Sequence, residues 1–456
     1  MQSKSLGSSA WKWVTAHLAS MAIGWLIGLA PTEGLAQAPS LSNCLWVGPV
    51  AAGQYNAAFP DEGAAYWYAE FQLPPGATLK LRGQFPRARY MSLNSYDGAG
   101  VPTDVLTDVA LVPNAGSSNP FAESARRSVP ARSYAMEVVG QPKPVGQRLP
   151  NMLYAGVAGQ SVQKLLYRVY VPDTGRDVAG DAGLPQHELR LSDGTTLYGD
   201  VACQVIGANP ARDIPLLRIK MPMEQFLKLR APVPNLPDTH PAASPPDWEG
   251  SFGAAYGRSR YLKGTSREAE RTRVPMTLSG GGYSNADIAY LVTDVDLKLG
   301  AVLVLYGKAP TTPRTRDGAE TMQAAQLRYW SICKNESPAT TRYVACLYDE
   351  QVPLDTQGFY TIAMSTGQDR PENALEKCGV AWLNAGTTGD GVDRPTAGSL
   401  LVRHLLPAPT FEQAIQKITK PQTEAQVMGA YLPSGTYMSR QQFEQRGCPA
   451  ARDARK

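Results

Sequence analysis

The chain repeats part of itself, and this repeat limits the folds that it can adopt. Residues 66–86 read YWYAEFQLPPGATLKLRGQFP, and residues 290–310 read YLVTDVDLKLGAVLVLYGKAP. The two segments align without a gap at an offset of 224 residues, and eight of the 21 positions are identical. Residues 89–97, RYMSLNSYD, then match residues 328–336, RYWSICKNE, at an offset of 239. Ordered matches of this kind indicate an internal duplication.

A third match links residues 167–177, YRVYVPDTGRD, with residues 360–369, YTIAMSTGQD, if one gap is allowed. In both segments an alternating strand enters a Thr-Gly-x-Asp turn, where glycine supplies the positive φ. We therefore expect each copy to contain a strand, a glycine turn, a second strand, an aromatic strand, a long excursion and a closing strand. The second copy also gains 15 residues before its aromatic strand.

The alternation of side chains predicts sheets with one packed face. Leu79 and Leu81 point to one side of their strand, and along residues 90–96 Met91 and Leu93 alternate with polar side chains. The 42 glycines and 37 prolines indicate many turns between short strands. These patterns predict a mainly β protein with two tandem antiparallel β-sandwich or jelly-roll modules, and a short helical C-terminal tail.

Changes in composition divide the chain into five parts. The region around 210–246 holds nine prolines and one short helical stretch near 223–230. After residue 406 helix formers dominate, and three Ser/Thr-x-x-Gln capping boxes begin at Thr410, Thr423 and Ser439. The expected parts are a signal peptide (1–36), a first β module (37–207), a Pro-rich linker (208–252), a second β module (253–405) and a helical tail (406–456).

The N-terminus has the features of a cleavable secretory signal. Lys4 and Lys12 precede an apolar run over residues 13–30, and Gly34 and Ala36 form a small-x-small cleavage site. The alternative is a membrane anchor, since the run could nearly span a bilayer. We expect cleavage before Gln37 and a secreted or periplasmic location, with no membrane span in the mature chain.

Six cysteines lie in the mature chain, and an even number in an exported protein indicates disulfides. The alternative is buried free thiols. Metal binding is not expected, because there is no Cys-x-x-Cys and the three mature histidines have no ligand spacing. The preferred pairs are Cys333 with Cys346 across a hairpin, Cys44 with Cys203, and Cys378 with Cys448.

Charge and motifs exclude several function classes. The formal net charge is +4, falling to +3 after signal cleavage, and there is no Lys/Arg cluster, so nucleic acid is not an expected partner. No Gly-x-Ser-x-Gly elbow, His-Glu-x-x-His, Walker loop or Gly-x-Gly-x-x-Gly motif occurs, and we expect no cofactor. His404 lies in an apolar run and is interpreted as a structural histidine.

The polar aromatic strand is the first candidate site. Asn94 and Tyr96 would project from one sheet face, and Asp97 ends the strand beside a glycine turn. The alternative is a solvated sheet face stabilised by cross-strand tyrosine pairs. Asn94 and Tyr96 are replaced by Cys333 and Asn335 in the second copy. Because residues that the fold requires should be shared, we expect a site to use residues present in one copy only.

The second candidate is the loop SGGGYSNAD at residues 279–287. Its glycines let the backbone approach a ligand, and Tyr283, Asn285 and Asp287 supply polar groups. The alternative is an ordinary Asx turn. The third candidate is the 15-residue insertion, which carries Arg314, Arg316 and Asp317, and a solvated loop explains it equally well.

The motifs LRGQFPRARYMSLNSYD, LLYRVYVPDTGRD and QLRYWSICKNE resemble those of a broad set of uncharacterised secreted bacterial proteins. The resemblance is to a repeated sheet pattern and covers most of the mature chain. The chain is also distantly similar to β-sandwich proteins of unknown function whose central strand reads aromatic-Trp-Ser-Leu followed by Tyr-Asp. Neither resemblance implies an activity, a cofactor or a catalytic residue.

Two hypotheses about function follow. The first is an exported binding protein that holds a small apolar or carbohydrate-like ligand between its two modules, where clefts commonly form. The alternative is a secreted hydrolase, lyase or isomerase that uses Asp97, Asp287 and an arginine or tyrosine as acid, base and charge stabiliser. A carboxylate of one copy facing an arginine or tyrosine of the other across a closed cavity would favour the enzyme.

Overall fold

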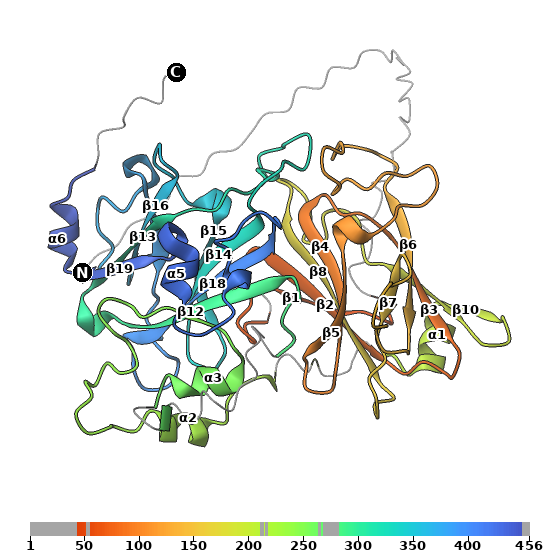
Figure 1. Ribbon diagram of the computed structural model, residues 1–456, viewed down its shortest axis with the longest axis horizontal. Helices are drawn as coiled ribbons and strands as arrows, with labels where there is room; N and C mark the ends of the chain where they lie inside the picture. The colour runs from red at the N-terminus through yellow and green to blue at the C-terminus, as the bar shows by residue number, and fades with distance from the viewer. Residues whose placement is uncertain are drawn as a thin grey trace, which may run out of the picture. The chain divides into compact units, whose positions relative to one another are not determined.

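The computed structural model describes residues 43–51, 55–209, 214, 218–262, 266–267 and 282–448, and the expected signal peptide lies outside them. Figure 1 colours the first module from red to yellow and the second from green to blue. The first module comprises β1 (Val47–Ala51), β2 (Ala64–Phe71), β3 (Thr78–Gln84), β4 (Ala88–Tyr96), β5 (Pro102–Thr107), β6 (Ser133–Val139), β7 (Met152–Tyr154), β8 (Gln163–Pro172), β9 (Gln186–Arg190), β10 (Thr196–Tyr198) and α1 (Gly199–Ile206).

The rest of the described chain builds the second module and its connections. It comprises α2 (Met223–Leu229), β11 (Glu249–Gly250), α3 (Ala254–Ser259), β12 (Ile288–Asp296), β13 (Val302–Lys308), β14 (Leu327–Asn335), β15 (Tyr343–Tyr348), β16 (Phe359–Ser365), β17 (Val380–Asn384), β18 (Ala397–Pro407), α5 (Glu424–Met428), β19 (Ser434–Met438) and α6 (Arg440–Glu444). The predicted helix near 223–230 is therefore confirmed as α2. Among the residues described, no helix is both long and apolar enough to cross a membrane.

The strands form four sheets, two in each module. Sheet I has the order β1-β2-β8-β4-β5 and sheet II the order β10-β9-β3-β6-β7. Sheet III has the order β11-β12-β18-β14-β15 and sheet IV the order β17-β16-β13-β19. Sheets I and III thus place corresponding strands in the same order. The β6–β7 and β16–β17 pairs are both parallel, and every other strand pair that the structure describes is antiparallel. The mainly β, tandem-sandwich prediction is confirmed.

Two glycines show the duplication at the level of single contacts. Gly83 on β3 lies opposite Tyr134 on β6, and Gly307 on β13 lies opposite Tyr360 on β16. A Cβ at Gly83 would lie 2.5 Å from the Tyr134 hydroxyl oxygen, and one at Gly307 would lie 2.7 Å from that of Tyr360. In both sheets a tyrosine ring covers a position that only glycine can occupy without a shift.

The third sequence match is wrong. Tyr167 lies on β8, in the centre of sheet I, whereas Tyr360 lies on β16 in sheet IV. The counterpart of β8 is β18, which lies between β12 and β14 as β8 lies between β2 and β4. The error arose because an alternating strand followed by a glycine turn occurs at many strand ends, so this pattern does not identify one particular strand.

Each module has its own apolar core, and the second face of each central sheet is buried as well. Leu79, Leu81, Met91 and Leu93 lie in the first core. A sheet with one packed face would leave the polar face of β4 exposed to solvent. Instead, all nine residues of β4 are buried. A third cluster joins side chains of sheets I and III across the two modules, namely Ala64, Tyr90, Tyr170, Val171, Ile288, Tyr329, Tyr348 and Leu405.

Reciprocal ion pairs cross this contact between the modules. Arg89 Nη1 of β4 donates to Asp349 Oδ2 at 2.6 Å, and Arg328 Nη1 of β14 lies 3.3 Å from Asp108 Oδ1. Each acceptor also binds its own module, because the Met91 amide donates to Asp108 and the Trp330 amide donates to Asp349. Arginine and aspartate at matching positions therefore pair in both directions.

The segment after residue 406 is not purely helical. Besides α5 and α6 it supplies β19, which pairs with β13 in sheet IV. Of the three expected capping boxes, the one at Ser439 forms, with the Gln442 amide donating to Ser439 Oγ at 3.1 Å. The expected apolar side packs on the second core through Phe411, Ile415, Ile418, Val427 and Tyr431.

The described cysteines form three disulfides, and these join the same pairs that the sequence analysis preferred. Cys333 and Cys346 are directly opposite each other on β14 and β15, with Cα atoms 4.0 Å apart. The other two bonds are Cys44–Cys203 and Cys378–Cys448. Two clusters bring together ligand types that bind metals, Cys44–His187–Cys203 and Asp61–Cys333–Cys346. In each cluster the two sulfurs are joined to each other and are not thiolate ligands.

Candidate functional site

A cavity of about 580 Å³ lies between the two modules, beside the polar faces of sheets I and III. Strands β2, β8, β12 and β18 supply part of its wall, and the segments at 57–60, 218–225, 250–261 and 282–285 supply much of the remainder. Five tyrosines line it: Tyr66, Tyr170, Tyr261, Tyr283 and Tyr290. The wall therefore combines aromatic surface with polar groups from both copies, as small-molecule sites commonly do.

The charged side chains among the described lining residues are all positive. Among the described lining residues there is no aspartate or glutamate, whereas six are cationic: Arg168, Arg218, Lys220, Arg258, Arg260 and Arg403. Arg260 is balanced by Asp294 outside the wall, with Nε and Oδ2 2.9 Å apart. Burial is the main cause that raises the pKa of Tyr66 to about 12, and Asp61 adds to it. The Tyr66 hydroxyl is therefore neutral at physiological pH.

The structure brings two of the predicted groups together. The Tyr96 hydroxyl donates to the Ser284 carbonyl at 2.9 Å, and its ring lies 5.0 Å from that of Tyr283, measured between centroids. Asn94 Oδ1 accepts from the Ala286 amide at 3.0 Å. Asn94 and Tyr96 therefore hold the 282–287 loop against β4, behind the cavity wall.

The residues of this loop have different positions. Tyr283 and Asn285 line the cavity. Asp287 does not, since its Oδ2 accepts from the Tyr90 hydroxyl at 2.7 Å and from Thr107 Oγ1 at 2.6 Å. Asp97 lies apart from the cavity wall, where its carboxylate accepts from the Ala99 and Val101 amides of its own turn.

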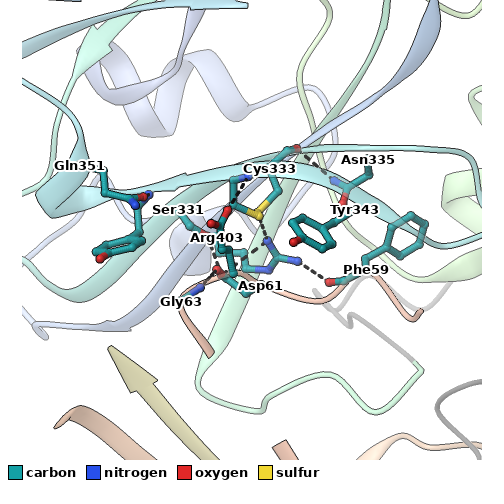
Figure 2. Close-up of a disulfide and its surroundings, with 12 residues drawn as sticks. Phe59, Asp61, Gly63, Ser331, Cys333, Asn335, Tyr343, Gln351 and Arg403 are labelled. Atoms are coloured by element: carbon teal, nitrogen blue, oxygen red, sulfur yellow. Dashed lines mark hydrogen bonds and ion pairs between the residues drawn. A yellow bond between two sulfur atoms is a disulfide. The ribbon is translucent and has the colours of Figure 1, made fainter. Parts of the chain in front are cut away.

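A cluster around Asp61 lies beside the cavity, at the Cys333–Cys346 disulfide (Figure 2). Asp61 is fully buried and accepts from the Tyr329 hydroxyl and from Ser331 Oγ, each at 2.7 Å. Arg403 Nη1 lies 3.6 Å from Asp61 Oδ2 and 2.9 Å from Cys333 Sγ, and Nη2 donates to the Phe59 carbonyl at 2.6 Å. A carboxylate of the first copy thus faces an arginine and a tyrosine of the second, but Asp61 is outside the cavity wall.

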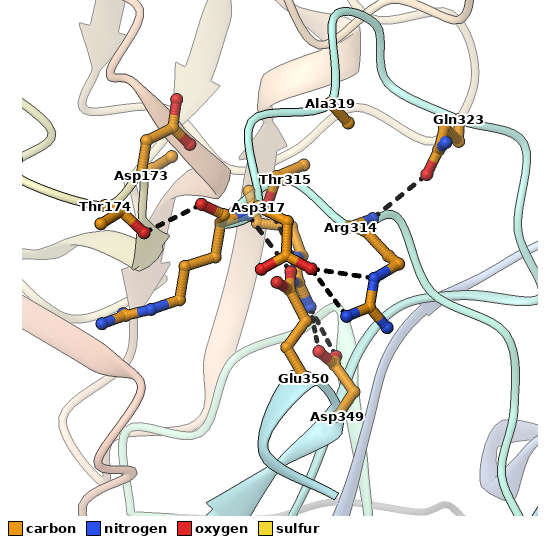
Figure 3. A network of polar contacts seen from close by, with 12 residues as sticks. Asp173, Thr174, Arg314, Thr315, Asp317, Ala319, Gln323, Asp349 and Glu350 are labelled. Carbon is orange, nitrogen blue, oxygen red and sulfur yellow. Dashed lines mark hydrogen bonds and ion pairs between the residues drawn. The ribbon is translucent and has the colours of Figure 1, made fainter. Parts of the chain in front are cut away.

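The insertion of the second copy supplies none of the described lining residues of the cavity, and it contacts the first module (Figure 3). Thr174 Oγ1 donates to the Arg316 carbonyl at 2.9 Å, and Arg89 Nε donates to Thr315 Oγ1 at 3.0 Å. Arg314 and Asp317 form an exposed ion pair with each other at 2.6 Å. The insertion therefore links the two modules.

Sequence reasoning missed Arg168 and Arg403, the two arginines that the central strands β8 and β18 bring to the wall. A signal was present, because each arginine is the one charged residue within an apolar run, LLYRVYV and LLVRHLL. A buried arginine in the middle of a strand needs a partner. The wrong match of β8 with β16 hid the equivalence of the two runs. His404, next to Arg403, is structural as expected: its Nδ1 accepts from the Ile415 amide at 3.2 Å.

No family model matches the chain, and no curated protein matches it. Solved structures of two uncharacterised bacterial proteins resemble it at 12% sequence identity. One is from Burkholderia cenocepacia, with a TM-score of 0.43 over 81% of this chain and 80% of that chain. The other is the VPA0106 protein from Vibrio parahaemolyticus, with a TM-score of 0.37 over 87% of this chain and 92% of that chain.

Proposed function

We propose that this protein is an exported binding protein that holds a small organic molecule in the cavity between its two modules. The observation that carries the proposal is the cavity itself, whose volume of about 580 Å³ falls within the range of ligand sites. Export is supported by the three disulfides, which persist in oxidising compartments.

Binding is favoured over acid–base catalysis by the position of the carboxylates. The enzyme hypothesis needs Asp97 and Asp287 beside a substrate, yet Asp97 binds its own turn and Asp287 binds Tyr90 and Thr107. The part of the wall that the structure describes contains no carboxylate. Tyrosine rings and arginines there can hold a ligand, whereas a proton acceptor of suitable pKa is absent from these lining residues.

The test is the mass spectrometry of small molecules retained by the protein after native purification from an exporting host. The variant Leu401→Trp fills the cavity, because Leu401 lines it and lies opposite Val292, another lining residue. Leu354→Trp is the matched control, since Leu354 is exposed and is not a lining residue.

We expect one molecule to be retained by the wild type and the control and to be lost from Leu401→Trp. Retention by all three proteins would place the ligand elsewhere. A wild type that carries nothing, and whose melting temperature no small molecule in a chemically diverse library raises, would contradict the proposal.

A further inference from the structure

Arg168 and Arg403 occupy equivalent positions in the two modules. On β8, Arg168 lies opposite Tyr66 of β2 and Ser92 of β4. On β18, Arg403 lies opposite Tyr290 of β12 and Ser331 of β14. Both residues are at most 3% exposed, and both line the cavity. The fold therefore presents the same cation from both sides, and their partners can be compared directly.

The two guanidinium groups differ in how they are neutralised. Arg403 has Asp61 at 3.6 Å and two further acceptors. Arg168 Nη2 donates to the Tyr283 carbonyl at 2.5 Å, and its Nη1 is buried with no hydrogen-bond partner among the described residues. Within the described part of the chain, Arg168 makes no ion pair with a carboxylate. Of the two equivalent arginines that line the cavity, Arg168 is thus the one with neither a carboxylate nor a full set of hydrogen bonds among the described residues.

The residue that corresponds to Asp61 in the second copy carries no charge. Its counterpart is Asn285, 224 positions later: the Asp61 and Asn285 carbonyls accept from the amides of Ala64 and Ile288, and their Oδ1 atoms accept from the amides of Gly63 and Asp287. Asp61 also accepts from Ser331, directly opposite Arg403. Asn285 instead donates from Nδ2 to the Tyr90 hydroxyl at 3.1 Å, and its neutral amide cannot pair with the Arg168 cation.

The surroundings of Arg168 favour a charged ligand with an aromatic or apolar body. Its guanidinium carbon lies 5.7 Å from the Tyr66 ring centre and 5.6 Å from that of Tyr96, so both rings are close enough for cation–π interactions. A buried cation with an unused donor is costly unless an anion pairs with it. A carboxylate accepts such N–H groups in the guanidinium plane.

We propose that Arg168 is the anchor for the ligand and that the ligand is an organic carboxylate, whose negative charge pairs with the Arg168 guanidinium while its apolar body lies along Tyr66, Tyr170 and Tyr290. This inference rests on the proposed function and adds the chemical class of the ligand. Arg403, already neutralised by Asp61, faces the body of the ligand and does not require a second anionic group.

The test compares benzoate with its neutral counterpart benzamide by isothermal titration calorimetry and by ligand-induced melting shifts. We expect the wild type to bind benzoate at least about tenfold more tightly, the effect of one charge-assisted hydrogen bond. Arg168→Gln should remove this preference and leave benzamide binding unchanged within about twofold. Arg190→Gln is the matched control, because Arg190 is an exposed arginine outside the described cavity wall.

Each outcome bears on the inference. Equal binding of the two probes by the wild type, or a preference for benzoate that survives in Arg168→Gln or falls equally in Arg190→Gln, would overturn it. If Arg168→Gln does not fold, Arg168→Lys and the charge of the natively retained molecule decide: a neutral molecule overturns the inference and leaves the proposed function standing. If the wild type binds neither probe and retains nothing, the proposed function fails as well.

Discussion

The two modules share their packing and their docking contacts but differ at one arginine. Gly83 and Gly307 each lie under a tyrosine ring, and Arg89 and Arg328 each reach an aspartate of the other module. In contrast, Arg403 has a buried carboxylate beside it and Arg168 has none among the described residues. Features needed for folding and docking are present twice. The feature that we assign to the ligand is present once.

The largest expected effect of a single substitution is at the docking arginines. Arg89→Ala leaves Asp349 and Glu350 without their shared cation, and the side chains of both acids are at most 4% exposed. We expect a loss of about 3–5 kcal/mol in the free energy of unfolding, measured by urea denaturation at pH 7.

Arg328→Ala is the comparison within the same contact. This variant leaves one carboxylate, that of Asp108, without its cation. Burial raises the pKa of Asp108 to about 6, so this acid can take up a proton at modest cost. We expect a smaller loss of about 1–3 kcal/mol. Arg314→Ala, which breaks an exposed pair, should cost less than about 1 kcal/mol. Equal losses in all three variants would contradict the docking role.

The disulfides of the two modules should also differ. Cys44–Cys203 closes a separation of 159 residues and Cys333–Cys346 a separation of 13. Loop-closure entropy predicts losses of about 5 and about 3 kcal/mol when each pair is replaced by alanines, a difference of about 2 kcal/mol. Urea midpoints of the two double variants measure this difference. A larger loss from the short loop would show that native contacts around Cys333, including Arg403, dominate.

The pH dependence of stability should separate the two central strands. His404 on β18 has a pKa lowered to about 3 by burial, and the adjacent position to Arg168 on β8 is Val169. Below about pH 6.5 the unfolded chain binds a proton that the folded chain does not, so stability falls as the pH is lowered toward 3. Between pH 7.5 and pH 5 this histidine should account for a loss of about 2 kcal/mol.

His404→Val removes this contribution and should flatten the profile by that amount, although the Ile415 amide then loses its acceptor and the overall stability falls. Denaturation at a series of pH values compares the two proteins. Parallel profiles for wild type and variant would show that His404 does not titrate on unfolding in this range.

The smallest expected effect concerns the tyrosines over the two glycines. The Tyr134 hydroxyl is buried and has no hydrogen-bond partner in the described structure. Tyr134→Phe should therefore raise the free energy of unfolding by up to about 1 kcal/mol. The Tyr360 hydroxyl is not buried without a partner in this way, so the same change at Tyr360 should bring no gain. A clear loss in Tyr134→Phe would indicate an unrecognised partner for this hydroxyl.

Sequence reasoning recovered the features that depend on local pattern. Leucine alternation and the matched glycines predicted the sheets, and the even cysteine count with a hairpin spacing led to the three disulfide pairs. Sequence also singled out Asn94, Tyr96 and the loop with Tyr283 and Asn285, which the fold brings together.

The remaining features depend on which faces meet across the chain. The polar side of β4 alternates as a solvated face would, and nothing local shows that another sheet covers it. Asp97 lies at the end of that strand, and the sequence is equally consistent with a ligand-binding group and with the turn cap that the structure shows. Arg168 was missed because its significance depends on Arg403, 235 positions away on the true counterpart strand, and on a missing carboxylate that only the fold reveals.

The reciprocal Arg–Asp pairs bear on how the two sides of the cavity came to differ in charge. An interface in which each partner gives the same arginine and receives the same aspartate is isologous, the kind that two identical chains form about a two-fold axis. In such a homodimer every substitution appears twice, so both arginines would keep or lose their carboxylate together. Joining the halves in one polypeptide holds them at high effective concentration and lets each change alone. Covalent fusion is therefore what permits a neutralised arginine on one side of the cavity and an unneutralised one on the other.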